Sequence, residues 1–366
     1  MADTRQMMLI SGALLIVQYT NILAADYSDD DDDNDDYDIT CAPIYRAPIA
    51  YERKAWSLAD MGWGDTECLE YLRFSRVEIA ELVRYLGLAE WVDSVVKMPG
   101  KYVRCSEQGL CMLLYRLASP GRLKDMIQVF GVSRSQISSV VNDLAGFLYE
   151  RYHKKLLWDH QRLSLERLRR YVQAIDETVG VSTETWGFID GTVRPIARPL
   201  EEQQRYYLGH KGYHGIKYQS IVTPDGLISS LYGPELGPKG DWKLWQESGV
   251  EQILRNLLKD VEDGEVLTLY GDPAYAPSYG IQAPYCAGRV GLMPEQEAFN
   301  VTMSKYRIEV EWGFANVLNQ FTSGEWKRMQ KIGLSPVSIN YMVSILLWNC
   351  QTCLRQRNQI SDHFGN

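Results

Sequence analysis

Apolar residues recur at the spacing of a helix face through the first half of the chain. The pattern predicts helices rather than strands, because apolar positions three and four residues apart line one side of an α-helix. The clearest stretches are Val77–Leu86, Leu110–Leu117, Leu123–Phe130 and Ile137–Leu148. Pro120 and Gly121 break the chain between the second and third stretch. We therefore expect an all-α module over residues 54–175.

The pattern changes near residue 185, where short β-prone runs begin to alternate with helical ones. We expect strands at Thr185–Ile189, Ile216–Thr223, Leu227–Tyr232 and Glu265–Tyr270. Helices are expected at Trp242–Leu258 and Met303–Phe321, and from Ser335-Pro336 onward, where a capping Ser precedes a Pro at the first helical position. Strands interleaved with helices predict an α/β domain over residues 176–366, placed behind the all-α module.

Residues 1–53 differ in composition from both of these parts. Residues 1–25 are largely apolar, and we interpret them as a helix that packs on the main body. The alternative is a secretory signal ending at Leu23-Ala24-Ala25, but the leading segment is not distinctly positive. Residues 26–53 begin with a run of nine Asp and no base between Asp26 and Asp38. Such a run repels itself, so we expect a flexible acidic linker.

Charge is unevenly distributed along the chain. The formal net charge is −9, the same as the charge of the Asp run alone. Residues 101–170 carry 13 Lys and Arg against six acids. This basic block predicts a surface for a polyanion such as DNA, and ordinary solvated helix faces are the alternative reading.

Two classes of protein are disfavoured by composition. No apolar run reaches the roughly 18–20 residues of a spanning helix, which argues against an integral membrane protein. The seven Cys are odd in number and scattered, which argues against a disulfide framework and favours a reducing compartment. Cys350 and Cys353 form a CxxC without a second pair, so a structural zinc site is not expected there.

The segment from Leu123 to Leu148 has the layout of a helix-turn-helix. Gly131 can adopt the positive φ that ends the first helix, and Ser133 can cap the second. The start of the second helix presents polar side chains suited to phosphates or base edges. These candidate DNA-binding residues are Arg134, Ser135, Gln136 and Ser138. The alternative is a helical hairpin with a polar tip.

Three acids occur where they can meet at one site. Asp190 follows the strand candidate Thr185–Ile189, and Asp272 follows the strand candidate Glu265–Tyr270. Carboxylates at strand ends point into the crevice where open α/β sheets bind ligands. A third acid on a nearby helix would complete an oxygen-rich site of the kind Mg²⁺ prefers. Surface charge is the alternative for any one of these acids.

The helix Met303–Phe321 offers two candidates for the third acid, Glu309 and Glu311. On a wheel of about 100° per residue, Glu311 lies roughly 75° from the centre of the apolar stripe and Glu309 roughly 125°. Glu311 is therefore the better candidate for a site between helix and sheet. Arg307 precedes it by four residues and can steer its carboxylate through an i,i+4 pair.

Five blocks occur in order along the second half of the chain: Phe188-Ile189-Asp190-Gly191-Thr192, the stretch from Tyr207 to Gln219, Gly237-Pro238-Lys239-Gly240-Asp241, Gly271-Asp272-Pro273-Ala274-Tyr275, and Arg307 with Val310-Glu311-Trp312-Gly313-Phe314. Taken together, these blocks resemble those of the DDE superfamily endonucleases of the PIF/Harbinger transposase type. They cover roughly residues 185–350, and the helix-turn-helix ahead of them also resembles the layout of that family. Several blocks in order are far more specific than any one of them.

The resemblance implies an RNase H-like fold and a metal-dependent nuclease. Asp190, Asp272 and Glu311 match the catalytic and metal-binding DDE triad, with Mg²⁺ or Mn²⁺ as the cofactor. It also implies a DNA partner, a nuclear location and no membrane, with a separate DNA-binding partner protein and homo-oligomers as further expectations. Basic residues after Asp190, Lys211 and Lys217 among them, are candidate phosphate contacts, with solvated hairpin residues as the alternative.

The chain departs from the family pattern at two places. Gly313-Phe314 stands where the family has Phe-Gly, which leaves Glu309 open as the third acid. Gly240 replaces a His before Asp241, and we interpret Asp241 as a helix N-cap rather than an accessory acid. A domesticated, non-catalytic DNA-binding or adaptor protein on the same fold is the alternative function.

Overall fold

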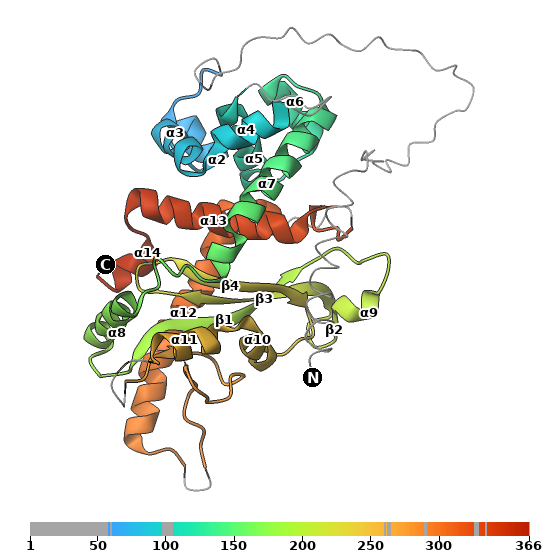
Figure 1. Cartoon of the computed structure of the whole chain (residues 1–366). Helices are drawn as coiled ribbons and strands as arrows, with labels where there is room; N and C mark the ends of the chain where they lie inside the picture. Colours follow the sequence, from blue (N-terminus) through green and yellow to red (C-terminus); the bar gives the residue numbers. More distant parts are fainter. Residues whose placement is uncertain are drawn as a thin grey trace. The chain divides into compact units, whose positions relative to one another are not determined.

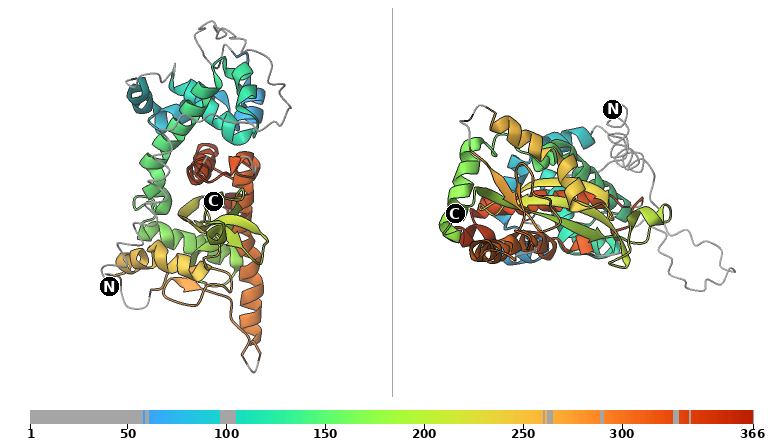
Figure 2. Two further views of the ribbon diagram at one scale, coloured as in Figure 1. Left: turned by 90° about the vertical axis from the view of Figure 1, so that its right-hand side faces the viewer. Right: turned by 90° about the horizontal axis from the view of Figure 1, so that it is seen from below.

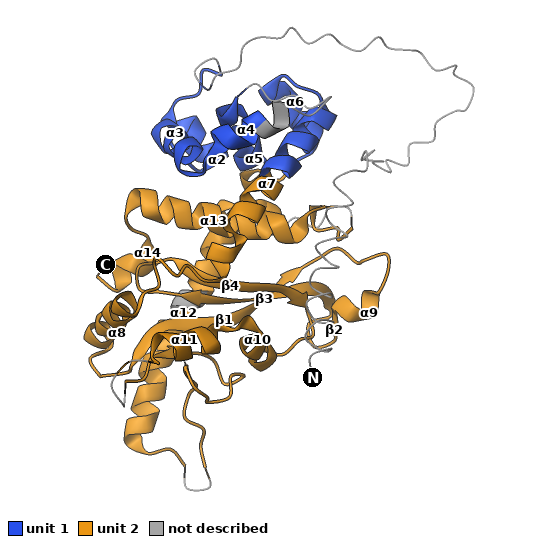
Figure 3. Cartoon of the chain, viewed as in Figure 1, with its two compact units in different colours: residues 1–116, 121–144 blue, residues 117–120, 145–366 orange. Residues whose placement is uncertain are grey.

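The computed structural model describes residues 58, 61–96, 105–259, 261, 265–288, 291–325, 329–333 and 335–365. The helix expected at 1–25 and the linker expected at 26–53 lie outside these residues. The chain forms two compact units (Figure 3), one made of residues up to 116 together with 121–144, the other of residues 117–120 and 145–366. Each unit is described by itself.

The first unit is all helical within its described residues, as expected. Its helices are α2 (Asp65–Leu72), α3 (Arg76–Tyr85), α4 (Leu88–Val96), most of α5 (Ser106–Ala118), α6 (Leu123–Phe130) and the start of α7 (Arg134–Leu157). Gly131 ends α6 with φ 64°, as its sequence context predicts. Gly109 lets α5 approach the buried ring of Trp91, because a Cβ there would overlap that ring.

The second unit is built on a mixed β-sheet (Figure 1). Its strands are β1 (Thr185–Pro195), β2 (Tyr207–Leu208), β3 (Tyr213–Val222), β4 (Ile228–Leu236), β5 (Thr268–Tyr270) and β6 (Ile281–Gln282). β3 lies antiparallel to β1, β2 and β4, whereas β5 lies parallel to β1 and to β6. Central β1 therefore has an antiparallel neighbour on one side and a parallel one on the other. This α/β architecture agrees with the expected RNase H-like fold.

Helices cover both faces of the sheet (Figure 2). On one face, α8 (Leu165–Val179), α10 (Asp241–Ser248) and α11 (Val250–Leu257) enclose a buried core with the sheet. The other face carries α12 (Pro294–Gln320), α13 (Val337–Arg355) and α14 (Gln359–His363). The short helices α9 (Gln203–Tyr206) and η1 (Thr322–Glu325) complete the unit.

Several expected boundaries differ from the observed ones. β1 continues from Thr185 to Pro195, so Asp190 lies inside this strand and not after its end, where the sequence analysis had placed it. Trp242–Leu258 is two helices, because Gly249 adopts φ 76° between them. α12 begins at Pro294, nine residues before Met303, where Met293 N donates to Gln296 Oε1. α13 begins at Val337 after Pro336 as N-cap, without the expected Ser335 side-chain cap. Residues 145–175 belong to the sheet-containing unit rather than to the helical one, because Leu163, Leu168 and Tyr171 join its core.

Among the described residues, none forms a helix that is both long and apolar enough to cross a bilayer.

Candidate active site

The register of two parallel strands brings Asp190 and Asp272 side by side. Phe188 of β1 pairs with Tyr270 of β5. Each acid lies two residues beyond its strand's partner in this pair, so the two carboxylates extend from neighbouring strands toward the same side. The negative charge of Asp272 contributes to raising the pKa of Asp190, which agrees with their proximity. The sequence-predicted pair of acids is thus brought together.

Asp190 occupies a largely buried position. Burial raises its pKa to about 6, against the opposing effect of the Arg307 guanidinium. Arg307 Nη1 of α12 lies 3.8 Å from Asp190 Oδ2, and the side chain of Asp190 is 17% exposed. A carboxylate held this far from water gains strongly from any cation placed beside it.

Asp272 sits in a tight turn directly after β5. Its Oδ1 accepts a hydrogen bond from Ala274 N at 3.0 Å, and its carbonyl accepts one from Tyr275 N at 3.1 Å. Burial raises the pKa of Asp272, and Asp241 raises it further. The turn fixes the carboxylate at the end of the strand, where the sequence predicted it.

Arg307 connects Glu311 of α12 to Asp190 of β1. Arg307 Nη2 donates to Glu311 Oε1 at 3.0 Å, the i,i+4 pair expected from the sequence. The same guanidinium contacts Asp190, so one cation links α12 to β1. The Glu311 side chain is 50% exposed and is bound by Arg307 rather than by the two Asp. The alternative acid, Glu309, has a side chain outside the described residues.

Asp241 is the acid that sequence analysis placed in the wrong role. The N-cap of α10 is Gly240, with no side-chain cap hydrogen bond, and Asp241 is the first helical residue. Its carboxylate instead forms an ion pair with Lys217 of β3, whose Nζ donates to Asp241 Oδ2 at 2.9 Å. A Cβ at residue 191 would overlap Asp241 Oδ1, so Gly191, next to Asp190, leaves room for this acid. The Gly191-Asp241 juxtaposition has no signal in local sequence.

Two further polar side chains join the acids. Gln219 Nε2 donates to Asp241 O at 3.3 Å and to the hydroxyl of Tyr275 at 3.2 Å. Tyr275 is 1% exposed, and burial raises its pKa well above the usual value, with Asp241, Asp190 and Asp272 all adding to the effect. The phenol therefore stays protonated near all three acids.

Two of the acids at this site, Asp190 and Asp272, are suited to bind a hard divalent cation, whereas the others are engaged by basic side chains. Mg²⁺ is commonly held by one or two carboxylates together with waters and substrate phosphates, and Asp190 with Asp272 supplies such a pair. A ready-made group of three or more potential ligands is absent from the described part of the chain. This agrees with the structure of the site, since Arg307 engages Glu311 and Lys217 engages Asp241.

The predicted DNA-binding residues lie at the start of α7. Arg134 and Ser135 are exposed, while Gln136 and Ser138 are half-buried. Gln136 has a structural task, since its Oε1 accepts from Ser133 N at 3.0 Å and its own N–H donates to Ser133 Oγ at 3.4 Å. This capping box leaves Arg134 and Ser135 as the more accessible members of the set.

The two candidate phosphate contacts near the sheet, Lys211 and Lys217, differ in their exposure to solvent. Lys211 is exposed in the turn between β2 and β3. Lys217 is only 8% exposed, and its Nζ donates to Lys239 O as well as to Asp241. Its expected role as a surface phosphate contact is therefore wrong for this conformation, because the ammonium is already satisfied inside the domain.

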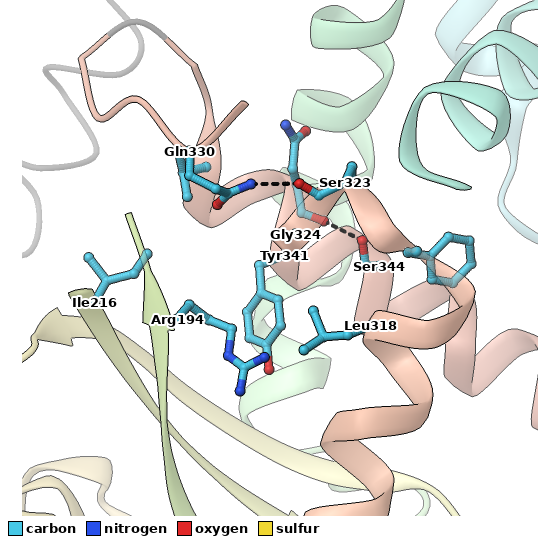
Figure 4. Close-up of a pocket in the computed structure, with 11 residues that line it drawn as sticks. Arg194, Ile216, Leu318, Ser323, Gly324, Gln330, Tyr341 and Ser344 are labelled. Carbon is cyan, nitrogen blue, oxygen red and sulfur yellow. Dashed lines mark hydrogen bonds between the residues drawn. The ribbon is translucent and has the colours of Figure 1, made fainter. Parts of the chain in front are cut away.

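A small cavity of about 10 Å³ lies elsewhere in the second unit (Figure 4). Arg194, Tyr341 and Gln330 are among its lining residues, and none of the acids described above belongs to the lining. The space suits about one water molecule. The cavity is therefore distinct from the acidic site.

Comparison with known proteins finds one family similarity, which lies in the sheet-containing unit. Residues 189–348 match the family model described as DDE superfamily endonuclease. This span contains Asp190, Asp241, Asp272 and Glu311. The searches of curated proteins and of solved structures returned no match.

Proposed function

Residues 189–348 match the family model of the DDE superfamily endonucleases, and on this premise we propose that the chain is a divalent-cation-dependent DNA endonuclease or transposase-like protein. The observation that supports it best is the adjacency of Asp190 and Asp272, fixed by the Phe188–Tyr270 register. Phosphodiester cleavage needs charge stabilisation at both the attacking and leaving oxygens, and paired carboxylates can hold the cations that provide it.

The proposed cofactor is Mg²⁺ or Mn²⁺, held by Asp190 and Asp272 with Glu311 joining from α12. When bound, such a cation activates water and polarises the phosphodiester. The chain's own residues orient the site: the turn at Asp272 fixes one carboxylate, and Arg307 contacts both Glu311 and Asp190. Release of Glu311 from Arg307 is required before that carboxylate can act as a full ligand.

DNA is the proposed partner, and the nucleus the proposed location. In this proposal the start of α7, with Arg134 and Ser135, contacts DNA as the second helix of a helix-turn-helix. The absence of acids in its first turn suits a phosphate at this helix end. A separate DNA-binding partner and a homo-oligomer belong to the same proposal.

Plasmid nicking tests the enzymatic proposal. The purified full chain is incubated with supercoiled DNA and Mg²⁺ or Mn²⁺, beside Asp190→Ala and Asp272→Ala. Asp225→Asn is the matched control, because Asp225 also forms an ion pair, at 3.0 Å with Arg162, but outside the acidic site. We expect at least a 100-fold loss of nicking in both Ala variants and little change in the control. Absence of nicking by the wild type, with Asp190→Ala identical to it in every DNA assay, would overturn the proposal.

One observation favours a second candidate, a non-catalytic DNA-binding or adaptor protein on the same fold. Within the described residues, the carboxylates of Glu311 and Asp241 are engaged by internal cations rather than assembled around an open position. An adaptor should bind DNA without Mg²⁺, and its binding should survive Asp272→Ala. Cation-dependent nicking would exclude this candidate.

A further inference from the structure

A pocket of about 260 Å³ lies where the ends of α12 and α13 meet the start of α14. Of the ten described residues that line it, six are Asn or Gln, two are Arg and none is Asp or Glu. The acids of the candidate active site are not part of this lining, and neither are the residues of the small cavity beside Arg194. The pocket is therefore a separate polar site with a positive charge.

Asn358 holds together the elements around the pocket. Its Oδ1 accepts hydrogen bonds from Ile360 N and Ser361 N at the start of α14, each at 3.0 Å. Its Nδ2 donates to Thr352 Oγ1 of α13 at 3.0 Å and to Gly226 O, in the turn between β3 and β4, at 2.8 Å. A Cβ at Gly226 would overlap the Asn358 amide, so the turn packs directly against it. A ligand would thus meet a pre-formed pocket, which lowers the cost of ordering on binding.

Several other lining side chains remain available to a ligand. Asn319, Arg357 and Gln359 are exposed, and Asn316 is half-buried. In the part of the chain that the structure describes, none of these four side chains forms a hydrogen bond or an ion pair. The Arg357 guanidinium differs in this respect from that of Arg307, which carboxylates engage. An unpaired guanidinium in a pocket without acids favours an anionic ligand.

The lining combines two kinds of hydrogen-bonding group. Carboxamides donate and accept in one plane, which matches the edge of a nucleobase. A guanidinium matches the oxygens of a phosphate. Trp348, largely buried, adds an apolar ring to the lining. A nucleotide presents both a phosphate and a base edge, and its whole base edge is accessible only when the base is unpaired.

We propose that this pocket binds one unpaired nucleotide of a DNA strand. The Arg357 guanidinium takes the phosphate, and the carboxamides of Asn316 and Asn319 take the base edge. The inference rests on the proposed function, because the strand is part of the DNA bound at the acidic site. Glu311 precedes Asn319 by eight residues of α12, which is about 12 Å of helix. That length corresponds to about three to four nucleotide steps, so a short DNA segment can reach both places.

Photocrosslinking locates the strand without relying on cleavage. The full chain, in EDTA, is mixed with a single-stranded oligonucleotide in which 5-bromodeoxyuridine replaces thymidine, irradiated and mapped by mass spectrometry. We expect crosslinks to residues 316–320 and 348–359, and Arg357→Gln should remove most of them. Arg255→Gln is the matched control, because Arg255 is also a solvent-accessible Arg but lies on α11. Crosslinks confined to other parts of the chain would overturn the proposal.

Fluorescence anisotropy with the same oligonucleotide separates the phosphate contact from the base contact. Arg357→Gln should weaken binding about tenfold and reduce the slope of log K against log salt concentration by about 0.7. Asn316→Ala/Asn319→Ala should weaken binding about threefold with an unchanged slope, because carboxamides carry no charge. Asn256→Ala, on α11, is the control for the amides. Unchanged affinity in both pocket variants, or an equal loss for duplex DNA of the same sequence, would refute an unpaired nucleotide in this pocket.

Free dAMP distinguishes a DNA strand from a free nucleotide as the source of the ligand. Binding of dAMP that depends on Arg357, with oligonucleotide binding unaffected by Arg357→Gln, would assign the pocket to free nucleotides and overturn the proposal. If the wild type nicks DNA while Arg357→Gln keeps wild-type crosslinks and affinity, this inference fails and the proposed function stands. A wild type that binds neither single-stranded nor duplex DNA would refute both.

Discussion

Substitution of Gly191 by Ala is the most direct test of how the acidic site is packed. The new Cβ would overlap Asp241 Oδ1 and lie 2.7 Å from Asp241 Cγ. Carbon atoms need about 3.7 Å, so the carboxylate must retreat by about 1 Å. Lys217 Cε, 3.2 Å from the same Cβ, restricts movement on the other side.

The size of the effect follows from the ion pair. Moving the charges from 2.9 Å to about 3.9 Å weakens their attraction by about 1.5 kcal/mol at an effective dielectric constant of about 20. For a unit of this size, that loss lowers the unfolding temperature by roughly 3–6 °C. Gly146→Ala is the matched control: nothing lies within 4 Å of a Cβ there, and the residue is inside α7. That variant should gain up to about 1 kcal/mol from helix propensity.

A double-variant cycle measured by thermal unfolding in EDTA identifies the cause. In an Asp241→Ala background the Cβ at residue 191 meets no carboxylate, so the cost of Gly191→Ala should largely vanish. The reasoning would be refuted by an equal cost in both backgrounds, or by a Gly191→Ala protein as stable as the wild type.

Three other outcomes are expected. Arg307→Gln removes the guanidinium that lowers the pKa of Asp190, so a carboxyl ¹³C NMR titration should place that pKa above about 6; an unchanged value would contradict the observed contact. In metal-free buffer, Asp190 binds a proton more tightly in the folded chain than in the unfolded one, since its pKa rises from 3.8 to about 6. The stabilisation that proton binding at Asp190 gives the folded chain is therefore fully present below pH 3.8 and is lost as the pH rises to about 6. This loss lowers the free energy of unfolding by up to about 3 kcal/mol. Asp190→Asn should abolish this component of the denaturation profile, and a profile identical to that of the wild type would refute it. Ser133→Ala breaks the capping box with Gln136 and should cost the first unit about 1 kcal/mol, seen as faster amide exchange at the start of α7; exchange no faster than in Ser135→Ala would contradict the cap.

Asp190 and Asp272 could be predicted as site residues because their signals are local, although β1 continues past Asp190 to Pro195. A short β-prone run followed by an acid identifies Asp190 and Asp272 separately, and parallel pairing then brings them together. The ion pair of Arg307 with Glu311 was equally accessible, because an i,i+4 spacing on one helix fixes the distance. A helical wheel gave only the direction of Glu311, and the structure shows a side chain half exposed and bound to Arg307.

The role of Asp241 could not be found in the same way. Its partner Lys217 lies 24 residues earlier on β3, and the room it occupies depends on a missing side chain on β1. An Asp after Gly at the start of a helix satisfies the statistical rule for capping, so the local signal pointed to the wrong role. Only the packing of α10 against the sheet shows that Asp241 forms an ion pair with Lys217 and does not cap the helix.

The Phe188–Tyr270 pairing constrains how this domain can change over evolutionary time. Loops between the two strands can lengthen or shorten freely, because neither carboxylate position depends on them. One residue inserted between Phe188 and Asp190, or between Tyr270 and Asp272, would turn that carboxylate to the opposite face of the sheet. Related sequences that keep the chemistry should therefore vary widely in the spacing between the two acids while preserving the two-residue step from each paired strand residue to its acid.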